Sequence, residues 1–282
     1  FKGDAISTTS ELVKISSDGN LGLQEGQKFE RGGIYRFTVD VTKGNTKAVL
    51  TVEKVGKVDL PAPDIFFGND KMEVTDTDIY KSDQAFTQGQ MITVTGIDNL
   101  NEWWIDPDFF EKQSDGALKF LPINGDYRVT ANAVLKYFSV MALKDGKPAK
   151  LQDDGTGAIW AIGKGIGKPS VTSSEVGWEP GKALCLAQVA SKKYQLTLKA
   201  GETLKTSGDP EVISFKFFHQ NDWGGEFGNY ASSILVEQLK LADSGNLEMQ
   251  DNKAFEEGAV YRFTIDVTNG NANADLKVEK IN

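Results

Sequence analysis

The chain has 282 residues, of which 39% are hydrophobic and 25% charged, the proportions of an ordinary globular protein with two or three domains. Its net charge of −9 argues against nucleic acid or anionic lipid as a ligand, because both require clustered Lys and Arg. A single cysteine, Cys185, and a single histidine, His219, allow no intrachain disulfide and no His/Cys zinc site. We therefore expect neither a cofactor nor a metal.

Two stretches of the chain repeat each other. Residues 1–56 align with residues 227–282 without a gap, and nearly half of the aligned pairs are identical. In the first copy Tyr35, Phe37 and Val39 alternate with polar residues, which predicts a strand with one buried face. A turn and a second alternating stretch complete a predicted hairpin in each copy.

The repeat also indicates where a domain is divided. The second copy is preceded by its own first half, residues 158–226, whereas the first copy starts at Phe1. Half a sandwich cannot bury its apolar face alone. We therefore expect the native protein to have residues upstream of Phe1.

Between the copies, alternating residues predict strands at 91–97, 127–131 and 137–141, and a helical turn is possible at 107–113. A proline-bearing linker and a glycine-rich boundary flank this region. The predicted plan has three segments: the C-terminal half of a first β-sandwich (1–57), a middle all-β domain (58–157) and a C-terminal sandwich (158–282).

The C-terminal segment contains a glycine-rich run, Gly163–Ser170, which is similar to a phosphate-binding loop. The spacing is one residue short, Pro169 replaces the hydroxyl residue, and we expect no helix after it. We interpret the run as a loop that joins strands or brings Lys164 or Lys168 to a ligand.

Trp223 lies in a loop that follows an alternating strand, residues 213–218. Asn221–Asp222 and Gly224–Gly225 are turn formers, and the glycines leave the faces of the indole ring uncovered. Such a ring can stack on the C–H face of a sugar while polar groups bind its hydroxyls. The alternative is that the ring folds back into the sandwich.

We expect the following side chains to bind a glycan: Trp178, Trp223, Lys164, Lys168, Gln220, Asn221 and Asp222, with Trp103 and Trp104 as a possible second site.

Catalysis is a weaker interpretation. Carboxylates lie near both tryptophan groups, and a glycosidase needs two of them about 5–10 Å apart. Acidic residues in loops are usually solvated, and no serine lies in the strand–elbow–helix context that a triad with His219 would need. We expect binding without turnover, and no catalytic residue.

The stretches Ile159–Gly163, Gly177–Trp178 and Phe215–Gly228 resemble the SusE/SusF-type surface glycan-binding lipoproteins of Bacteroidetes, and also the small β-domains appended to pullulanases. The resemblance covers residues 158–282 and, through the repeat, 1–56. It implies tandem β-sandwiches, a lipid anchor, display on the outer membrane and non-catalytic capture of oligosaccharide. It also implies that Trp178 and Trp223 hold the ligand, with Lys164 or Lys168 as the basic partner.

The expected fold is therefore all-β, with tandem sandwiches of the immunoglobulin-like or carbohydrate-binding-module-like type. The expected function is binding of oligosaccharide or polysaccharide at the bacterial surface within a glycan-uptake system, with other outer-membrane uptake proteins as possible partners. Two alternatives stay open: a structural or adhesive protein without a sugar site, and a glycoside hydrolase or its accessory domain.

Overall fold

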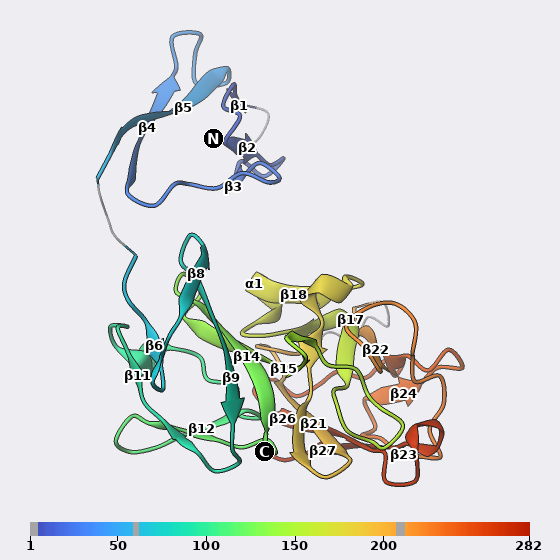
Figure 1. The fold of residues 1–282 in the computed structure, drawn as a ribbon. Helices are drawn as coiled ribbons and strands as arrows, with labels where there is room; N and C mark the ends of the chain where they lie inside the picture. The colour runs from blue at the N-terminus through green and yellow to red at the C-terminus, as the bar shows by residue number, and fades with distance from the viewer. Residues whose placement is uncertain (1–4, 59–61, 207–211) are drawn as a thin grey trace. The chain divides into compact units, whose positions relative to one another are not determined.

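The chain is all-β, which confirms the predicted fold class. The computed structural model describes residues 5–58, 62–206 and 212–282, and these form β-sheets with one four-residue α-helix and short 3₁₀ turns. The chain divides into two compact units, Phe1–Ala62 and Pro63–Asn282 (Figure 1).

Unit 1 is built around the hairpin predicted from the repeat. Strand β4 pairs antiparallel with β5, and β1 adds to β5 in parallel, while β2 and β3 form a separate ribbon. The strands are β1 (Ile6–Thr8), β2 (Val13–Ile15), β3 (Leu21–Leu23), β4 (Gly33–Asp40) and β5 (Ala48–Lys57).

The two copies of the repeat differ in how far their apolar face is buried. In unit 1, Phe37 is 48% and Val39 43% exposed. The matching residues of the second copy, Phe263 and Ile265, are completely buried. The same strand pattern therefore forms in both copies, but among the described residues this face is covered on β26 and exposed on β4.

The middle region of unit 2 carries a five-stranded antiparallel sheet in the order β16-β15-β14-β9-β8 and two small three-stranded sheets. Its elements are β6 (Phe66–Phe67), β7 (Asp70–Lys71), β8 (Glu73–Asp76), β9 (Ile79–Phe86), β10 (Met91–Ile92), β11 (Val94–Thr95), η1 (Leu100–Glu102), β12 (Phe110–Lys112), β13 (Leu118–Phe120), β14 (Gly125–Asn132), β15 (Tyr137–Lys144) and β16 (Lys147–Pro148).

The C-terminal region of unit 2 contains two larger sheets, ordered β18-β17-β22-β25-β24, with β19 also on β17, and β20-β21-β26-β27-β23. Its elements are β17 (Trp160–Gly167), α1 (Val171–Ser174), β18 (Glu175–Gly177), η2 (Pro180–Lys182), β19 (Leu184–Cys185), β20 (Ala187–Ala190), β21 (Lys193–Lys199), β22 (Ser214–Phe218), β23 (Ser232–Ile234), β24 (Leu239–Leu241), β25 (Leu247–Met249), β26 (Val260–Asp266), η3 (Asn271–Asn273) and β27 (Asp275–Lys280).

An aromatic cluster joins these two sheets. Phe263 of β26 lies 5.5 Å from Phe215 and 6.4 Å from Phe217 of β22, measured between ring centroids. All three rings are completely buried. Because alternate residues of a strand point to opposite faces, Phe218 and Lys216 of β22 lie on the other face of that sheet.

The glycine-rich run is a strand, not a loop. Residues up to Gly167 belong to β17, and the α1 turn follows it, although we expected no helix there. At Gly163, with φ of 142°, an added Cβ would lie 2.3 Å from the Cα of Phe215. Glycine is required here because β22 approaches closely, and this explains the composition without a ligand. The possible helical turn at 107–113 is a turn followed by β12.

Three buried charged residues join the middle and C-terminal regions, and we call them the buried lysine network. The Nζ atom of Lys168 lies 2.8 Å from both carboxylate oxygens of Asp106 and 3.0 Å from Oδ2 of Asp108. Asp108 also accepts hydrogen bonds from Nε2 of Gln195 and from the amide and hydroxyl of Thr197, at 2.6–2.7 Å. The three charged side chains are at most 7% exposed.

Burial and pairing set the pKa values in this network. Burial, with the charge of Asp108, raises the pKa of Asp106 although Lys168 opposes the shift. Burial alone would raise the pKa of Asp108, but Lys168 and the hydrogen bonds from Gln195 and Thr197 lower it below its ordinary value. Burial disfavours the charged amine, yet the two carboxylates raise the pKa of Lys168.

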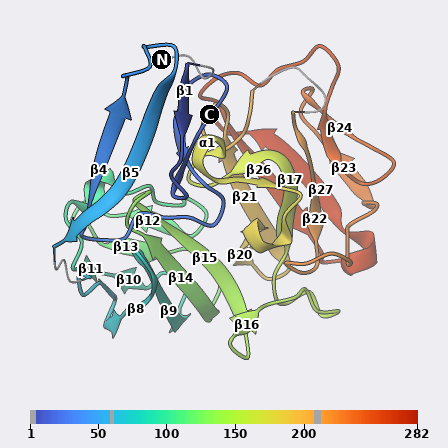
Figure 2. The ribbon, with the colours of Figure 1, turned by 90° about the horizontal axis from the view of Figure 1, so that it is seen from above.

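Neutral contacts extend the junction. The indole nitrogen of Trp160 donates to the carbonyl of Ala149 at 3.0 Å, and the amide of Ile123 donates to the carbonyl of Gln188 at 2.8 Å. The middle and C-terminal regions also share one continuous hydrophobic core. Figure 2 shows β14 and β15 beside the elements of the C-terminal region.

Replacing Lys168→Met should destabilise the protein by about 3–5 kcal/mol at pH 7, because two buried carboxylates lose their counter-ion. The lowered pKa of Asp108 stabilises the wild type above the ordinary aspartate pKa, and this contribution is lost as pH falls through the lowered value. As pH falls, the unpaired carboxyls of the variant should take up protons before those of the wild type. The difference in unfolding free energy between the two proteins should therefore narrow between pH 7 and about pH 4. Urea unfolding at several pH values in this range measures that difference.

The matched control is Lys164→Met, which removes an exposed lysine from β17, four residues before Lys168. This variant should change stability by less than about 0.5 kcal/mol. Equal effects of the two substitutions, or a difference that does not vary with pH, would show that the network does not hold the two regions together.

Candidate functional site

Trp178 and Trp223 form a stacked pair, which we call the tryptophan pair. Their ring centroids lie 6.4 Å apart and their planes are inclined by 26°. Trp223 is 50% exposed, and Trp178 is half-buried against the core. Two rings at this spacing contact each other, so they offer one extended apolar surface instead of a slot between them.

A buried phenylalanine supports the exposed ring. Phe218, the last residue of β22, lies edge-on to Trp223 with ring centroids 6.0 Å apart, and it is 1% exposed. The amide of His219 donates to the carbonyl of Gly225 at 2.7 Å and closes the loop that carries the ring. The exposed indole is therefore held by the end of a core strand.

The polar side chains of this loop mainly hold its backbone. Nε2 of Gln220 donates to the carbonyl of Trp223 at 2.6 Å, and Oδ1 of Asp222 accepts from the amide of Trp223 at 2.8 Å. The structure therefore places both residues beside Trp223, as expected. Their side chains, however, already hydrogen-bond to the backbone of Trp223. Asn221 is half-buried next to them.

The basic partners of the tryptophan pair differ from the expectation. Lys168 belongs to the buried lysine network and cannot reach a ligand there. Lys164 is exposed and pairs with Ser214 across β17 and β22. Lys216 lies two residues from Phe218 on the same face of β22, whereas Lys164 pairs with Ser214, four residues from Phe218. The alternation of Phe218 and Lys216 in the sequence was the signal that could have identified it.

The only histidine lies behind the loop. His219 packs edge-on against Phe227 with ring centroids 4.3 Å apart, and its Nε2 is buried without a partner among the described residues. Burial lowers its pKa, so the ring is neutral at pH 7. This residue supports the loop through its packing against Phe227.

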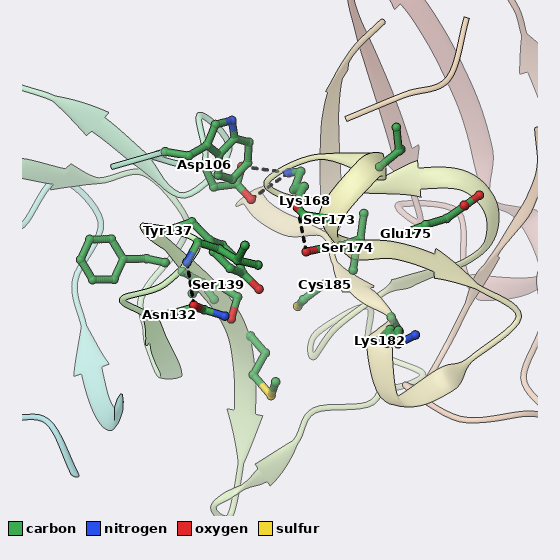
Figure 3. A pocket seen from close by; sticks show the side chains of 18 of the residues that line it. Asp106, Asn132, Tyr137, Ser139, Lys168, Ser173, Ser174, Glu175, Lys182 and Cys185 are labelled. Carbon is green, nitrogen blue, oxygen red and sulfur yellow. Dashed lines mark hydrogen bonds and ion pairs between the residues drawn. The ribbon is translucent and has the colours of Figure 1, made fainter. Parts of the chain in front are cut away.

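The two adjacent tryptophans of the middle region separate. Trp103 is buried and stacks on Phe138 at 4.7 Å, so it belongs to the core and not to a second site. Trp104 points to the other side, is half-buried, and lines a hollow of about 540 Å³ between the middle and C-terminal regions. We call this hollow the Trp104 cleft; Figure 3 shows it from close by.

We also searched the described residues for metal sites and membrane-spanning helices. Within residues 5–58, 62–206 and 212–282, no group of three or more His, Cys, Asp or Glu side chains could hold a metal ion. No helix in that part of the chain is both long enough and apolar enough to cross a membrane.

Two family models match the chain. The family model described as Domain of unknown function (DUF5121) matches residues 1–42 and 154–268, more than half of the chain. The chain belongs to the DUF5121 family. A second model, Domain of unknown function (DUF5125), matches residues 58–151 of the middle region. No curated protein matches the sequence.

The DUF5121 match includes the first 42 residues of each copy of the repeat, and in the C-terminal region it also includes both members of the tryptophan pair. The Trp104 cleft, by contrast, is lined from both matched segments: Trp104 and Tyr137 lie in the DUF5125 match, and Ser174 and Cys185 lie in the DUF5121 match.

Gly225→Ala should disturb the loop that carries Trp223. Gly225 has φ of 70°, where a side chain costs about 1–2 kcal/mol, and its Cβ would lie 3.2 Å from the Cβ of His219. We expect a loss of about 1–2 kcal/mol in unfolding free energy and a change in the fluorescence of Trp223. Gly228→Ala is the control, because nothing lies within 4 Å of its Cβ and its φ is not positive. The two variants behaving alike would contradict this account.

Proposed function

We propose that the protein binds a neutral oligosaccharide or polysaccharide without cleaving it, at the tryptophan pair. The observation that carries this proposal is the 50% exposure of Trp223 while it is held between Trp178 and Phe218. Exposing a large aromatic ring costs free energy unless a ligand covers it, and a rigid ring loses little entropy on binding. A pyranose ring is a suitable partner, because its C–H face is apolar and flat.

The polar surroundings favour a neutral, hydroxyl-rich ligand. Lys216 and Lys164 lie on the face that carries Phe218, and their amines can donate to sugar hydroxyls. The net charge of −9 disfavours nucleotides and nucleic acids, whose bases would also stack on indole rings. The exposed carboxylate of Asp222 holds the backbone of Trp223, which suits a binding surface better than a catalytic one.

The finer assignment rests on the sequence resemblance. We propose a SusE/SusF-like role in polysaccharide utilisation, with the protein displayed as a lipoprotein on the outer-membrane surface. Other glycan-uptake proteins of that membrane would be its partners.

Trp223→Ala should weaken glycan binding at least tenfold, because the substitution removes the exposed half of the apolar surface. Affinity electrophoresis in gels containing α-glucan, β-glucan, xylan, mannan or fructan measures the retardation, and circular dichroism checks the fold. Ile234→Ala removes another exposed apolar side chain, 62% exposed, and should leave retardation unchanged. Release of reducing ends would favour the hydrolase, and failure of every glycan to retard the wild type would favour the structural role.

Lys216→Met should weaken binding about threefold to tenfold, because it removes one charged hydrogen-bond donor from the face of β22 that carries Phe218. Lys164→Met should have a smaller effect, since Lys164 lies farther along the sheet from Phe218. The dissociation constants follow from retardation at several glycan concentrations. A larger effect of Lys164→Met would place the ligand at the other end of this face.

A further inference from the structure

The Trp104 cleft has two facing walls. One comes from the middle region, through Trp104 and β15, and the other from α1, β18, η2 and β19 of the C-terminal region (Figure 3). Its volume of about 540 Å³ falls within the range of about 300–1,000 Å³ that small-molecule sites occupy. The buried lysine network joins these same two regions, so the walls are fixed relative to each other.

An aromatic side chain is positioned on the first wall. The indole nitrogen of Trp104 donates to Oε1 of Glu202 at 2.9 Å, across the junction of the two regions. The amine of Lys168 lies 5.9 Å from the centre of the Trp104 ring. Tyr137 lies beside Trp104 in an isolated β-bridge and also lines the cleft. The half-buried Trp104 ring therefore has a fixed orientation before any ligand arrives.

The charged groups in the cleft are already paired within the protein. Asp106 is bound to Lys168, Glu175 accepts from Lys205 at 2.8 Å, and Lys182 donates to Glu179 at 2.9 Å. A charged ligand would have to compete with these pairs. The charged side chains of the cleft named here therefore have partners within the protein before a ligand binds.

The other polar groups of the cleft are hydroxyls and an amide. Asn132 uses its Oδ1 to accept from the amides of Val134 and Leu135, which leaves its amide nitrogen as a donor. Ser139 and Thr172 add hydroxyls on opposite walls. Cys185 also lines the cleft, but burial raises its pKa to about 12, so its thiol is no nucleophile at neutral pH.

We propose that the Trp104 cleft is a second carbohydrate-binding site, which takes a neutral oligosaccharide between the middle and C-terminal regions. Its ligand class rests on the proposed function of the tryptophan pair. A fixed indole ring, neutral donors and internally paired charges are the features that recognise sugar hydroxyls and C–H faces without attracting ions. The middle region then contributes directly to glycan capture.

The test uses the full chain labelled with 5-fluorotryptophan. The chain has five tryptophans, and the ¹⁹F signals of Trp104, Trp178 and Trp223 are assigned with single Trp→Phe variants. The probes are malto-, cello-, xylo- and mannohexaose. At least one probe should shift the Trp104 signal with a saturating dose response and should also shift the Trp223 signal.

Thr172→Phe places an aromatic ring at the mouth of the cleft from an exposed position of α1. It should weaken the response of Trp104 at least tenfold and leave that of Trp223 within twofold of wild type. Thr172→Ser is the matched control and should change neither response by more than twofold. An unshifted signal of the buried Trp103 in the unliganded variants shows that the fold is intact.

The possible failures are distinguishable. If a probe shifts the Trp223 signal and no probe shifts the Trp104 signal, the cleft is not a sugar site and the tryptophan pair remains the binding site. If a probe shifts the Trp104 signal and none shifts the Trp223 signal, the cleft is a sugar site and the tryptophan pair is not. A Trp104 response that Thr172→Phe does not weaken also overturns the cleft, and a panel that moves neither signal overturns both sites.

Discussion

The arrangement of unit 2 depends on one buried amine. Lys168 binds the carboxylates of Asp106 and Asp108, which come from a turn about 60 residues earlier in the chain. Removing these charges from water is costly, so the network is stabilising only while all its partners are in place. The buried carboxylate of Asp108 gains its further hydrogen bonds from Gln195 and Thr197 on β21. The network thus specifies how the middle region sits against the C-terminal sheets, and a generic apolar contact would specify this less strictly.

The junction fixes one proposed site relative to the other. Strand β22, which ends at Phe218, holds the exposed ring of Trp223, and the face of the middle region that meets the C-terminal region carries Trp104. Two weak sugar sites on one rigid body would bind the same polysaccharide chain with greater avidity than either site alone. Non-catalytic capture benefits from such an arrangement, because each site can release while the other retains the chain.

The sequence predicted those features that depend on local periodicity. Alternation in β4 and β26 indicated strands with one apolar face, and the glycines around Trp223 indicated an uncovered ring. It could not distinguish Lys164 from Lys168, because their difference depends on Asp106 and Asp108, far away in the chain. It also assigned the run from Gly163 to a loop, since the need for glycine arises from the approach of Phe215. Trp103 and Trp104 are neighbours with the same sequence context. The sequence therefore does not show that Trp103 is buried in the core while Trp104 lines the cleft.

The most direct test of the central claim is oxidative footprinting of tryptophan, read residue by residue by mass spectrometry. In the free protein Trp223 should oxidise fastest and the buried Trp160 slowest. Adding the polysaccharide that retards the protein in affinity gels should protect Trp223 at least severalfold. If Trp223 oxidises at the same rate with and without a bound polysaccharide, the tryptophan pair is not where the glycan binds.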